Sequence, residues 1–99
     1  MQTDPLDILK NMDPKLLELV SQNRDFTFKD GALPAKIKYL IAFALDAAHG
    51  VTEGINALSS LAVKHGSMKE EVLEALHVTN FISGVGSVYT AARGLRDIF

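Results

Sequence analysis

The sequence predicts an all-α fold with six helices, and three observations lead to this prediction. Apolar residues recur three and four positions apart along most of the 99 residues, as they do on the buried side of a helix. No segment shows the sustained polar–apolar alternation of a half-buried strand. Asp-Pro pairs, glycines and a capping pattern stand where helices would begin or end. A chain of this length is expected to form one domain.

Two Asp-Pro pairs, at positions 4–5 and 13–14, open the N-terminal helices. In each pair the aspartate can accept a free backbone N–H, and the proline stands where no donor is needed. The pairs predict a short helix over about 5–12 and a second helix over about 14–23. The segment 26–33, which contains a glycine, is expected to be a connection.

Four further helices are expected to complete the chain, over about 34–49, 52–64, 67–82 and 88–99. Ser67 and Glu70 have the spacing of a capping box, which would start the third of these. Gly84 and Gly86 are expected to break the chain before the last one. In the helix expected over 34–49, the apolar residues that recur at helical spacing are Ile37, Leu40, Ile41, Ala44, Leu45 and Ala48.

The composition argues against several functional classes. Ten Lys and Arg residues against twelve Asp and Glu give a net charge of −2, and no basic face is visible, so nucleic-acid binding is not expected. There is no cysteine, which excludes disulfides and thiolate nucleophiles. The longest apolar run, 39–45, is far shorter than the ~20 residues of a membrane span. The N-terminus lacks the pattern of a signal peptide. We expect a cytoplasmic protein without a cofactor.

The apolar content predicts self-association. Hydrophobic residues make up 47% of the chain, and the mean hydropathy is +0.14. A chain of this size buries only roughly 60–65% of its unfolded surface. Burial between subunits would cover the excess, so we expect a homo-oligomer.

The middle of the chain carries a recognisable order of motifs. These are KIKYLIA at 36–42, AVKHGS at 62–67, EEVLEAL at 70–76 and SGVG at 83–86. Their order and spacing over about 31–95 resemble the carboxymuconolactone decarboxylase/alkylhydroperoxidase D-like family. The resemblance implies that family's helical fold, with N-terminal helices over 1–30 and the family core over 31–99. It also implies a trimer or a hexamer.

The resemblance also locates the family's active site. Alkylhydroperoxidase-like members carry a C-x-x-C-x-x-x-H motif and a glutamate twelve residues before it. Here Val51 and Gly54 stand at the two thiol positions, Leu58 at the relay histidine and Tyr39 at the glutamate. Disulfide cycling needs two thiolates, so the thiol peroxidase mechanism is excluded for this chain acting alone. The lactone decarboxylases keep a histidine at the same position, where this chain has Leu58. Whether this chain is an enzyme therefore stays open.

Ionisable residues cluster near the same place. Asp46, His49 and Glu53 follow one another at i, i+3 and i+7 and would form an acid/base set if the helix continued through them. Alternatively, Gly50 breaks the helix, and they are solvated residues at helix ends. Tyr39 is either a proton donor into the pocket or part of the core. The three histidines lack metal-ligand spacing, and no metal is expected.

Two functions remain as hypotheses. The first is a non-redox member of the family, either an oligomeric scaffold or a binding protein for a small hydrophobic ligand. Its pocket would lie at the four positions of the family's active site, which are Tyr39, Val51, Gly54 and Leu58 here. The second is an enzyme with lactone decarboxylase-like or isomerase-like acid/base chemistry. Its relocated catalytic residues would be His49, Glu53 or Tyr39.

Overall fold

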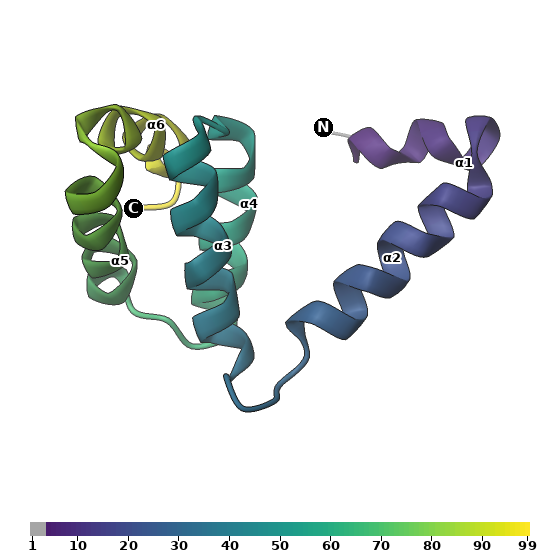
Figure 1. Ribbon diagram of the computed structural model, residues 1–99, viewed down its shortest axis with the longest axis horizontal. Coiled ribbons are helices and arrows are strands. Elements are labelled where there is room, and N and C mark those ends of the chain that lie inside the picture. The colour runs from purple at the N-terminus through teal and green to yellow at the C-terminus, as the bar shows by residue number, and fades with distance from the viewer. Residues whose placement is uncertain (1–3) are drawn as a thin grey trace.

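The computed structural model describes residues 4–99 and confirms the all-α prediction; the first three residues of the expected N-terminal segment lie outside this range. Within it, a 3-10 turn is followed by six α-helices and no strand (Figure 1). The elements are η1 (Pro5–Ile8), α1 (Leu9–Met12), α2 (Pro14–Phe28), α3 (Ala35–His49), α4 (Thr52–Lys64), α5 (Lys69–Ser83) and α6 (Val85–Leu95).

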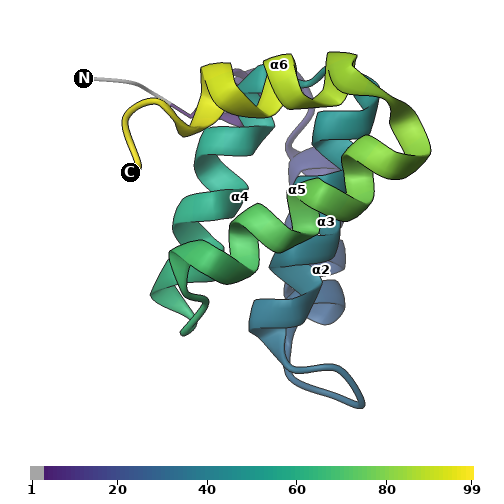
Figure 2. The same ribbon diagram turned by 90° about the vertical axis from the view of Figure 1, so that its left-hand side faces the viewer.

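The chain divides into two parts that diverge like the limbs of a V (Figure 1). We call residues 4–28 the arm and helices α3 to α6 the core bundle. The arm meets the core bundle through α2 and α3, next to the turn that joins them. In the core bundle, α3 and α4 lie side by side, and α6 crosses their upper ends (Figure 2). The open angle between the two parts sets the position of the site described below.

The hydrophobic core lies among the four helices of the core bundle. Its buried apolar members are Phe43, Ala47, Ile55, Val72, Ala91 and Leu95. Helix α6 approaches α4 closely at Gly94, where an added Cβ would overlap the side chain of Ile55 and lie 2.9 Å from the Thr52 carbonyl oxygen. Glycine is therefore required at this crossing because no side chain fits between the two helices.

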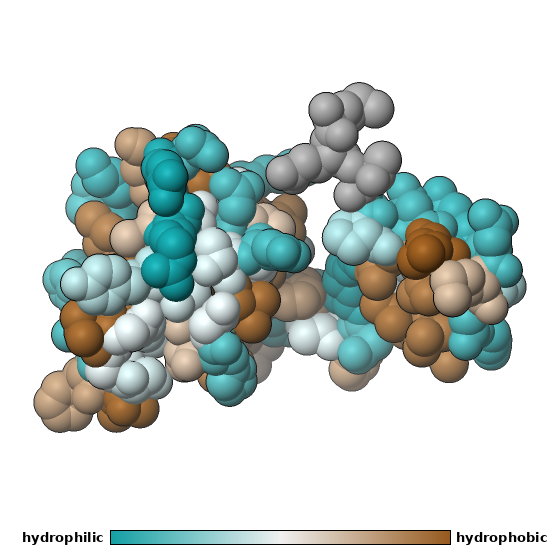
Figure 3. Space-filling view, turned by 90° about the horizontal axis from the view of Figure 1, so that it is seen from above, coloured by the Kyte–Doolittle hydropathy of each residue, from teal (hydrophilic) through white to brown (hydrophobic). Residues whose placement is uncertain are grey.

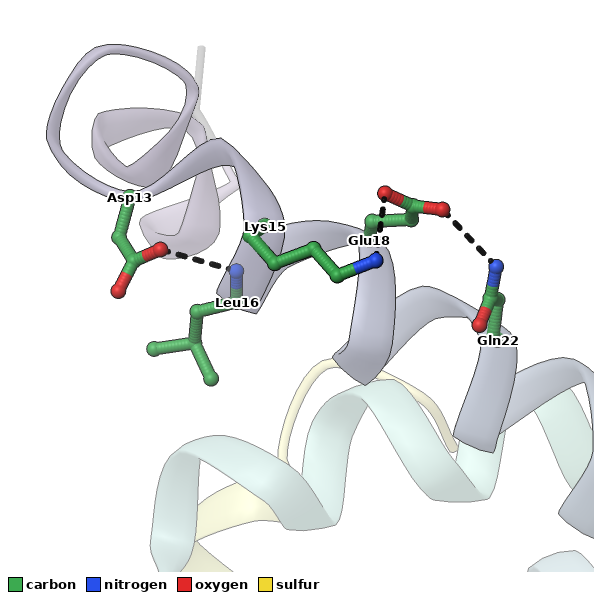
Figure 4. Close-up of polar contacts among 5 residues, drawn as sticks. All are labelled: Asp13, Lys15, Leu16, Glu18 and Gln22. Atoms are coloured by element: carbon green, nitrogen blue, oxygen red, sulfur yellow. Dashed lines mark hydrogen bonds and ion pairs between the residues drawn. The ribbon is translucent and has the colours of Figure 1, made fainter.

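Local capping starts the arm helices as the Asp-Pro pairs predict. Asp4 Oδ1 accepts the Leu6 N–H at 2.9 Å, and Asp13 Oδ1 accepts the Leu16 N–H at 3.0 Å. Farther along α2, Glu18 pairs with Lys15 at 3.6 Å and accepts a hydrogen bond from Gln22 at 3.1 Å, as Figure 4 shows. These contacts are local and exposed, so they stabilise the helix but do not hold the arm against the core bundle.

The connection expected over 26–33 is shorter than predicted, because α2 continues to Phe28. Two tertiary contacts extend the helix. The Phe28 ring stacks on Tyr39, and the Lys38 ammonium donates to the carbonyl oxygens of Thr27 and Lys29, at 2.9 and 2.7 Å. The last carbonyls of a helix lack intrahelical partners, and the ammonium satisfies two such groups.

The expected capping box at Ser67 and Glu70 is wrong by one residue. Helix α5 has Met68 at its N-cap, and Glu71 Oε1 accepts the Met68 N–H at 2.8 Å. Glu71 also forms an ion pair with Lys36 of α3 at 3.2 Å. This contact with another helix favours Glu71 as the residue that caps the start of α5. The Ser67 hydroxyl is buried and has no hydrogen-bond partner within residues 4–99.

The last helix starts earlier than expected, at Val85 instead of position 88, and ends at Leu95. Only Gly84 breaks the chain, with φ +84°, a conformation that L side chains rarely adopt. Gly86 lies inside the first turn of α6. Ser87 supports the start, because its hydroxyl donates to the Gly84 carbonyl oxygen at 2.7 Å.

Helix α3 buries a different side from the one expected. Phe43 and Ala47 are the buried residues near its middle and end, whereas Ile41 and Leu45 are 45% and 54% exposed. The helix is apolar on most of its circumference, so spacing alone does not select the side that faces α4, α5 and α6. None of the helices within residues 4–99 has the length and apolarity that crossing a bilayer requires.

Candidate functional site

A cleft of about 470 Å³ lies between the arm and the core bundle. The arm contributes the start of η1 and the inner side of α2, and the core bundle contributes α3 and α4. The residues that line it are Asp4, Pro5, Arg24, Phe28, Tyr39, Ala57, Leu58 and Leu61. Seen from above, a hollow separates the two parts (Figure 3). The lining is mainly apolar, with one cation and one carboxylate from the arm.

Three aromatic rings lie together where the arm meets the core bundle, and two of them, Phe28 and Tyr39, line the cleft. The Phe28 and Tyr39 rings are nearly parallel, with centroids 4.5 Å apart and an angle of 3° between their planes. The His65 ring is tilted by 37° to the Tyr39 ring, and the two centroids are 5.0 Å apart. His65 Nδ1 lies 2.9 Å from the Leu61 carbonyl oxygen, one of the last carbonyls of α4. These three rings join α2, α3 and the end of α4.

A carboxylate lies at the opposite end of the α3–α4 pair. A Cβ atom on Gly54 would overlap the Asp46 carboxylate, so this side chain packs directly over the glycine. Val51 Cγ1 lies 3.5 Å from the same Cβ position. Burial raises the pKa of Asp46 above its usual range, and the nearby His49 opposes this effect. Asp46 is thus a partly desolvated acid beside the first turn of α4.

The residues predicted from the sequence separate into three groups. Tyr39 and Leu58 line the cleft. Val51 and Gly54 lie beside Asp46 at the start of α4. His49 and Glu53 are exposed near the α3–α4 turn and do not line the cleft. No group of three metal-ligating side chains occurs within residues 4–99.

The arm residues of the cleft, Asp4, Pro5, Arg24 and Phe28, were not predicted as site residues. A periodic pattern on α2 could have identified the last two. Leu17, Val20, Arg24 and Phe28 follow at i, i+3, i+7 and i+11, so they share one side of the helix. Asp4 has no comparable pattern, because only the return of the chain toward α4 brings it to the cleft.

Comparisons with known proteins give one family and one solved structure. Residues 14–97 match the sequence profile of the Carboxymuconolactone decarboxylase family. The apo crystal structure of a carboxymuconolactone decarboxylase family protein from Legionella pneumophila superposes with a TM-score of 0.85 at 34% sequence identity. That match covers 92% of this chain and 81% of the other. No curated protein matches the sequence.

Proposed function

Because the chain belongs to the carboxymuconolactone decarboxylase family and contains no cysteine, we propose that it is a non-redox member that binds a small apolar molecule. The cleft between the arm and the core bundle is the observation that carries this proposal. Its volume of about 470 Å³ falls within the range of small-molecule sites, and most of its lining is apolar.

The lining also explains why binding is favoured over redox chemistry. Tyr39 and Leu58, which replace the glutamate and the histidine of the family's relay, are both in contact with the cleft. An aliphatic group at the relay histidine position transfers no proton and instead contributes apolar surface. Burial of that surface against a ligand would supply binding energy at about 25 cal/mol per Å².

Filling the cleft tests this proposal. In the variant Leu58→Trp the larger side chain would occupy the cleft, whereas Val63→Trp places the same side chain outside it on the same helix. The probe is octanol, titrated by calorimetry into the intact protein. We expect octanol to bind the wild type and Val63→Trp alike and to lose at least tenfold in affinity for Leu58→Trp. Equal affinities in all three proteins would contradict the proposal.

We also propose that the chain assembles as a homo-oligomer, a trimer or a hexamer as is common in the family. Its exposed apolar surface supports this. Five residues at the end of α5 and the start of α6 are 63–86% exposed, on the side of the core bundle away from the arm (Figure 1). We call this surface the α5–α6 tip, and its residues are Val78, Phe81, Ile82, Val85 and Tyr89.

The arm carries a second apolar surface, visible as brown side chains on the right-hand part of Figure 3. Its exposed residues include Met12, Leu16, Leu19 and Phe26. Large contiguous apolar patches on a small protein are typical of interaction surfaces. Two separate patches, one on the arm and one on the core bundle, suit a closed ring, in which each copy contacts two neighbours.

Acid/base catalysis is the second candidate function, with Tyr39, His49 or Glu53 as its catalytic residues. One observation favours it: the Tyr39 side chain lines the cleft and is therefore in reach of a bound molecule. The test is activity toward small lactones and their isomers with all three residues replaced by alanine, singly and together. Any detected turnover that survives the triple replacement would exclude these residues as the catalysts.

A further inference from the structure

The two walls of the cleft differ in their chemistry. The core bundle contributes an apolar wall on α4, where Ala57, Leu58 and Leu61 follow one another at i, i+1 and i+4. The arm contributes the charged groups of the lining, which are Arg24 on α2 and Asp4 at the start of η1. A ligand that fits both walls therefore has an apolar body and a charged end.

The Arg24 guanidinium has unused capacity to bind an anion. The ion pairs formed within residues 4–99 use Lys10, Lys15 and Lys36 and leave Arg24 out. The side-chain hydrogen bonds along α2 leave it out as well. A guanidinium carries five N–H donors in a fixed fork, and this fork matches the two oxygens of a carboxylate.

Asp4 is the opposing charge in the cleft, and its carboxylate is already engaged. Asp4 Oδ1 accepts the Leu6 N–H at 2.9 Å as the N-cap of η1. A hydrogen bond of this kind satisfies part of the bonding capacity of the carboxylate. Of the two charges in the lining, the guanidinium therefore gains more from an incoming partner.

A second polar group of the cleft supports an anionic end on the ligand. Tyr39 lines the cleft, and its ring stacks on Phe28, which lies one turn after Arg24 on the same side of α2. The side-chain hydrogen bonds that α3 forms within residues 4–99 come from its two lysines. The Tyr39 hydroxyl is therefore available as a further donor to an anion.

We propose that the cleft binds an apolar monocarboxylate, with its carboxylate on the Arg24 guanidinium and its hydrocarbon part on the apolar wall of α4. This inference deepens the proposed function and rests on it, because the cleft must hold the apolar part. A ligand that covers the guanidinium also removes water from it, and the ion pair is then stronger than an exposed one.

Binding of such a ligand would link the arm to the core bundle. The hydrogen bonds between the two parts join the Lys38 ammonium to carbonyl oxygens near the end of α2. Residues 4–26 form no hydrogen bond or ion pair with the core bundle as the structure describes it. A ligand held between Arg24 and α4 would therefore add a contact across the open part of the V (Figure 1).

The experiment is a calorimetric titration of octanoate, octanol and octylamine into the intact protein, at neutral pH and low salt. The three probes have the same chain length and differ in the charge of the end group. We expect octanoate to bind about tenfold more tightly than octanol, because a charge-assisted hydrogen bond replaces a neutral one. Arg24→Gln should reduce the affinity for octanoate to that for octanol. Lys15→Gln, which removes a cation of α2 outside the cleft, should retain the preference.

A charge reversal separates ligand binding by Arg24 from a structural role. Arg24→Glu should invert the order, so that octylamine binds more tightly than octanoate, and a damaged fold would not produce this new preference. A preference for octanoate that persists in Arg24→Gln would overturn the assignment. So would tighter binding of octylamine than octanoate by the wild type, because Asp4 would then govern the charge of the ligand.

Amide exchange provides an independent measurement of the link between the two parts. Saturating octanoate should slow deuterium uptake over residues 14–28 of the wild type, because the bound ligand restrains the arm. Uptake that stays unchanged at saturation would contradict a ligand held between Arg24 and α4.

The outcomes distinguish this inference from the proposed function. If octanol binds the wild type and is lost in Leu58→Trp, but octanoate has no advantage, the cleft binds ligands and the role of Arg24 is wrong. If none of the three probes binds the wild type, the proposed function fails, and the assignment of Arg24 fails with it.

Discussion

The phenyl ring of Phe28 lies parallel to the phenol ring of Tyr39, with a centroid distance of 4.5 Å. This stack joins the last turn of the arm to α3, and both rings line the cleft. The Lys38 ammonium, which binds two carbonyl oxygens near the end of α2, holds the same junction from the neighbouring position. The shape of the cleft therefore depends on contacts near one end of a long helix.

Phe28→Ala should release the arm. The variant loses the stacking contact and part of the apolar burial, which together are worth about 1 to 2 kcal/mol. Hydrogen–deuterium exchange should rise over residues 14–28 and change little in the core bundle. Phe26→Ala is the matched control, because that ring is 69% exposed on the same helix. Equal exchange in both variants would show that the stack does not hold the arm.

Gly94→Ala should be among the most damaging single substitutions in the core bundle. The added methyl group would overlap Ile55 and crowd the Thr52 carbonyl, so α6 must move away from α4. Overpacking of this kind costs about 1–3 kcal/mol, measured as a loss of unfolding free energy in urea. Gly86→Ala, in the same helix but with open space around its Cβ, should cost nothing comparable. A small effect at Gly94 would mean that the helices separate easily.

Local chemistry accounts for the parts of the fold that the sequence predicts. The caps at Asp4 and Asp13 and the helix end at Gly50 depend on groups within a few residues of one another. The buried side of α3 depends instead on distant helices. Ile41 and Leu45 fit the periodic pattern as well as Phe43 does, and only the packing of α5 and α6 distinguishes them.

The candidate site likewise contains residues that the sequence predicts and residues that only long-range contacts bring there. The resemblance places Tyr39 and Leu58 together, and both line the cleft. Arg24 and Phe28 could not be assigned to it because the path of the arm is set by long-range contacts. Asp46 stands in the sequence as one member of an i, i+3, i+7 series, but its relation to Gly54 follows from the antiparallel pairing of α3 and α4.

Glu71 should make the free energy of unfolding decrease at acidic pH. The hydrogen bond from the Met68 N–H, and then the contact with Lys36, lower the pKa of Glu71 below its ordinary value of 4.5. A folded-state pKa below the unfolded one means that ionised Glu71 stabilises the fold. This contribution is complete above the ordinary value and is lost as the pH falls through the lower, folded-state pKa.

The measurement for Glu71 is urea denaturation from pH 7 to pH 3. Glu71→Gln should be less stable than the wild type at pH 7, and the difference should shrink toward pH 3. Glu70→Gln removes the same charge from the neighbouring position, which makes neither contact, and should keep the wild-type dependence. A constant difference between Glu71→Gln and the wild type across the range would exclude this role.

Phe81→Ser should weaken the proposed assembly without unfolding the protomer. The ring is 86% exposed in the single chain, so its removal costs the isolated fold little. In an oligomer that covers the α5–α6 tip, the same ring would be buried, and its loss would cost roughly 1.5–3 kcal/mol per contact. Light scattering after size-exclusion chromatography should show a smaller mass for the variant at low micromolar concentration. Val63→Ser, at a position that is 40% exposed on α4 and outside the tip, is the control and should keep the wild-type mass. A monomeric wild type would contradict the proposed assembly. If Phe81→Ser leaves an oligomer intact while Leu19→Ser on the arm dissociates it, the contact is the arm surface and not the α5–α6 tip.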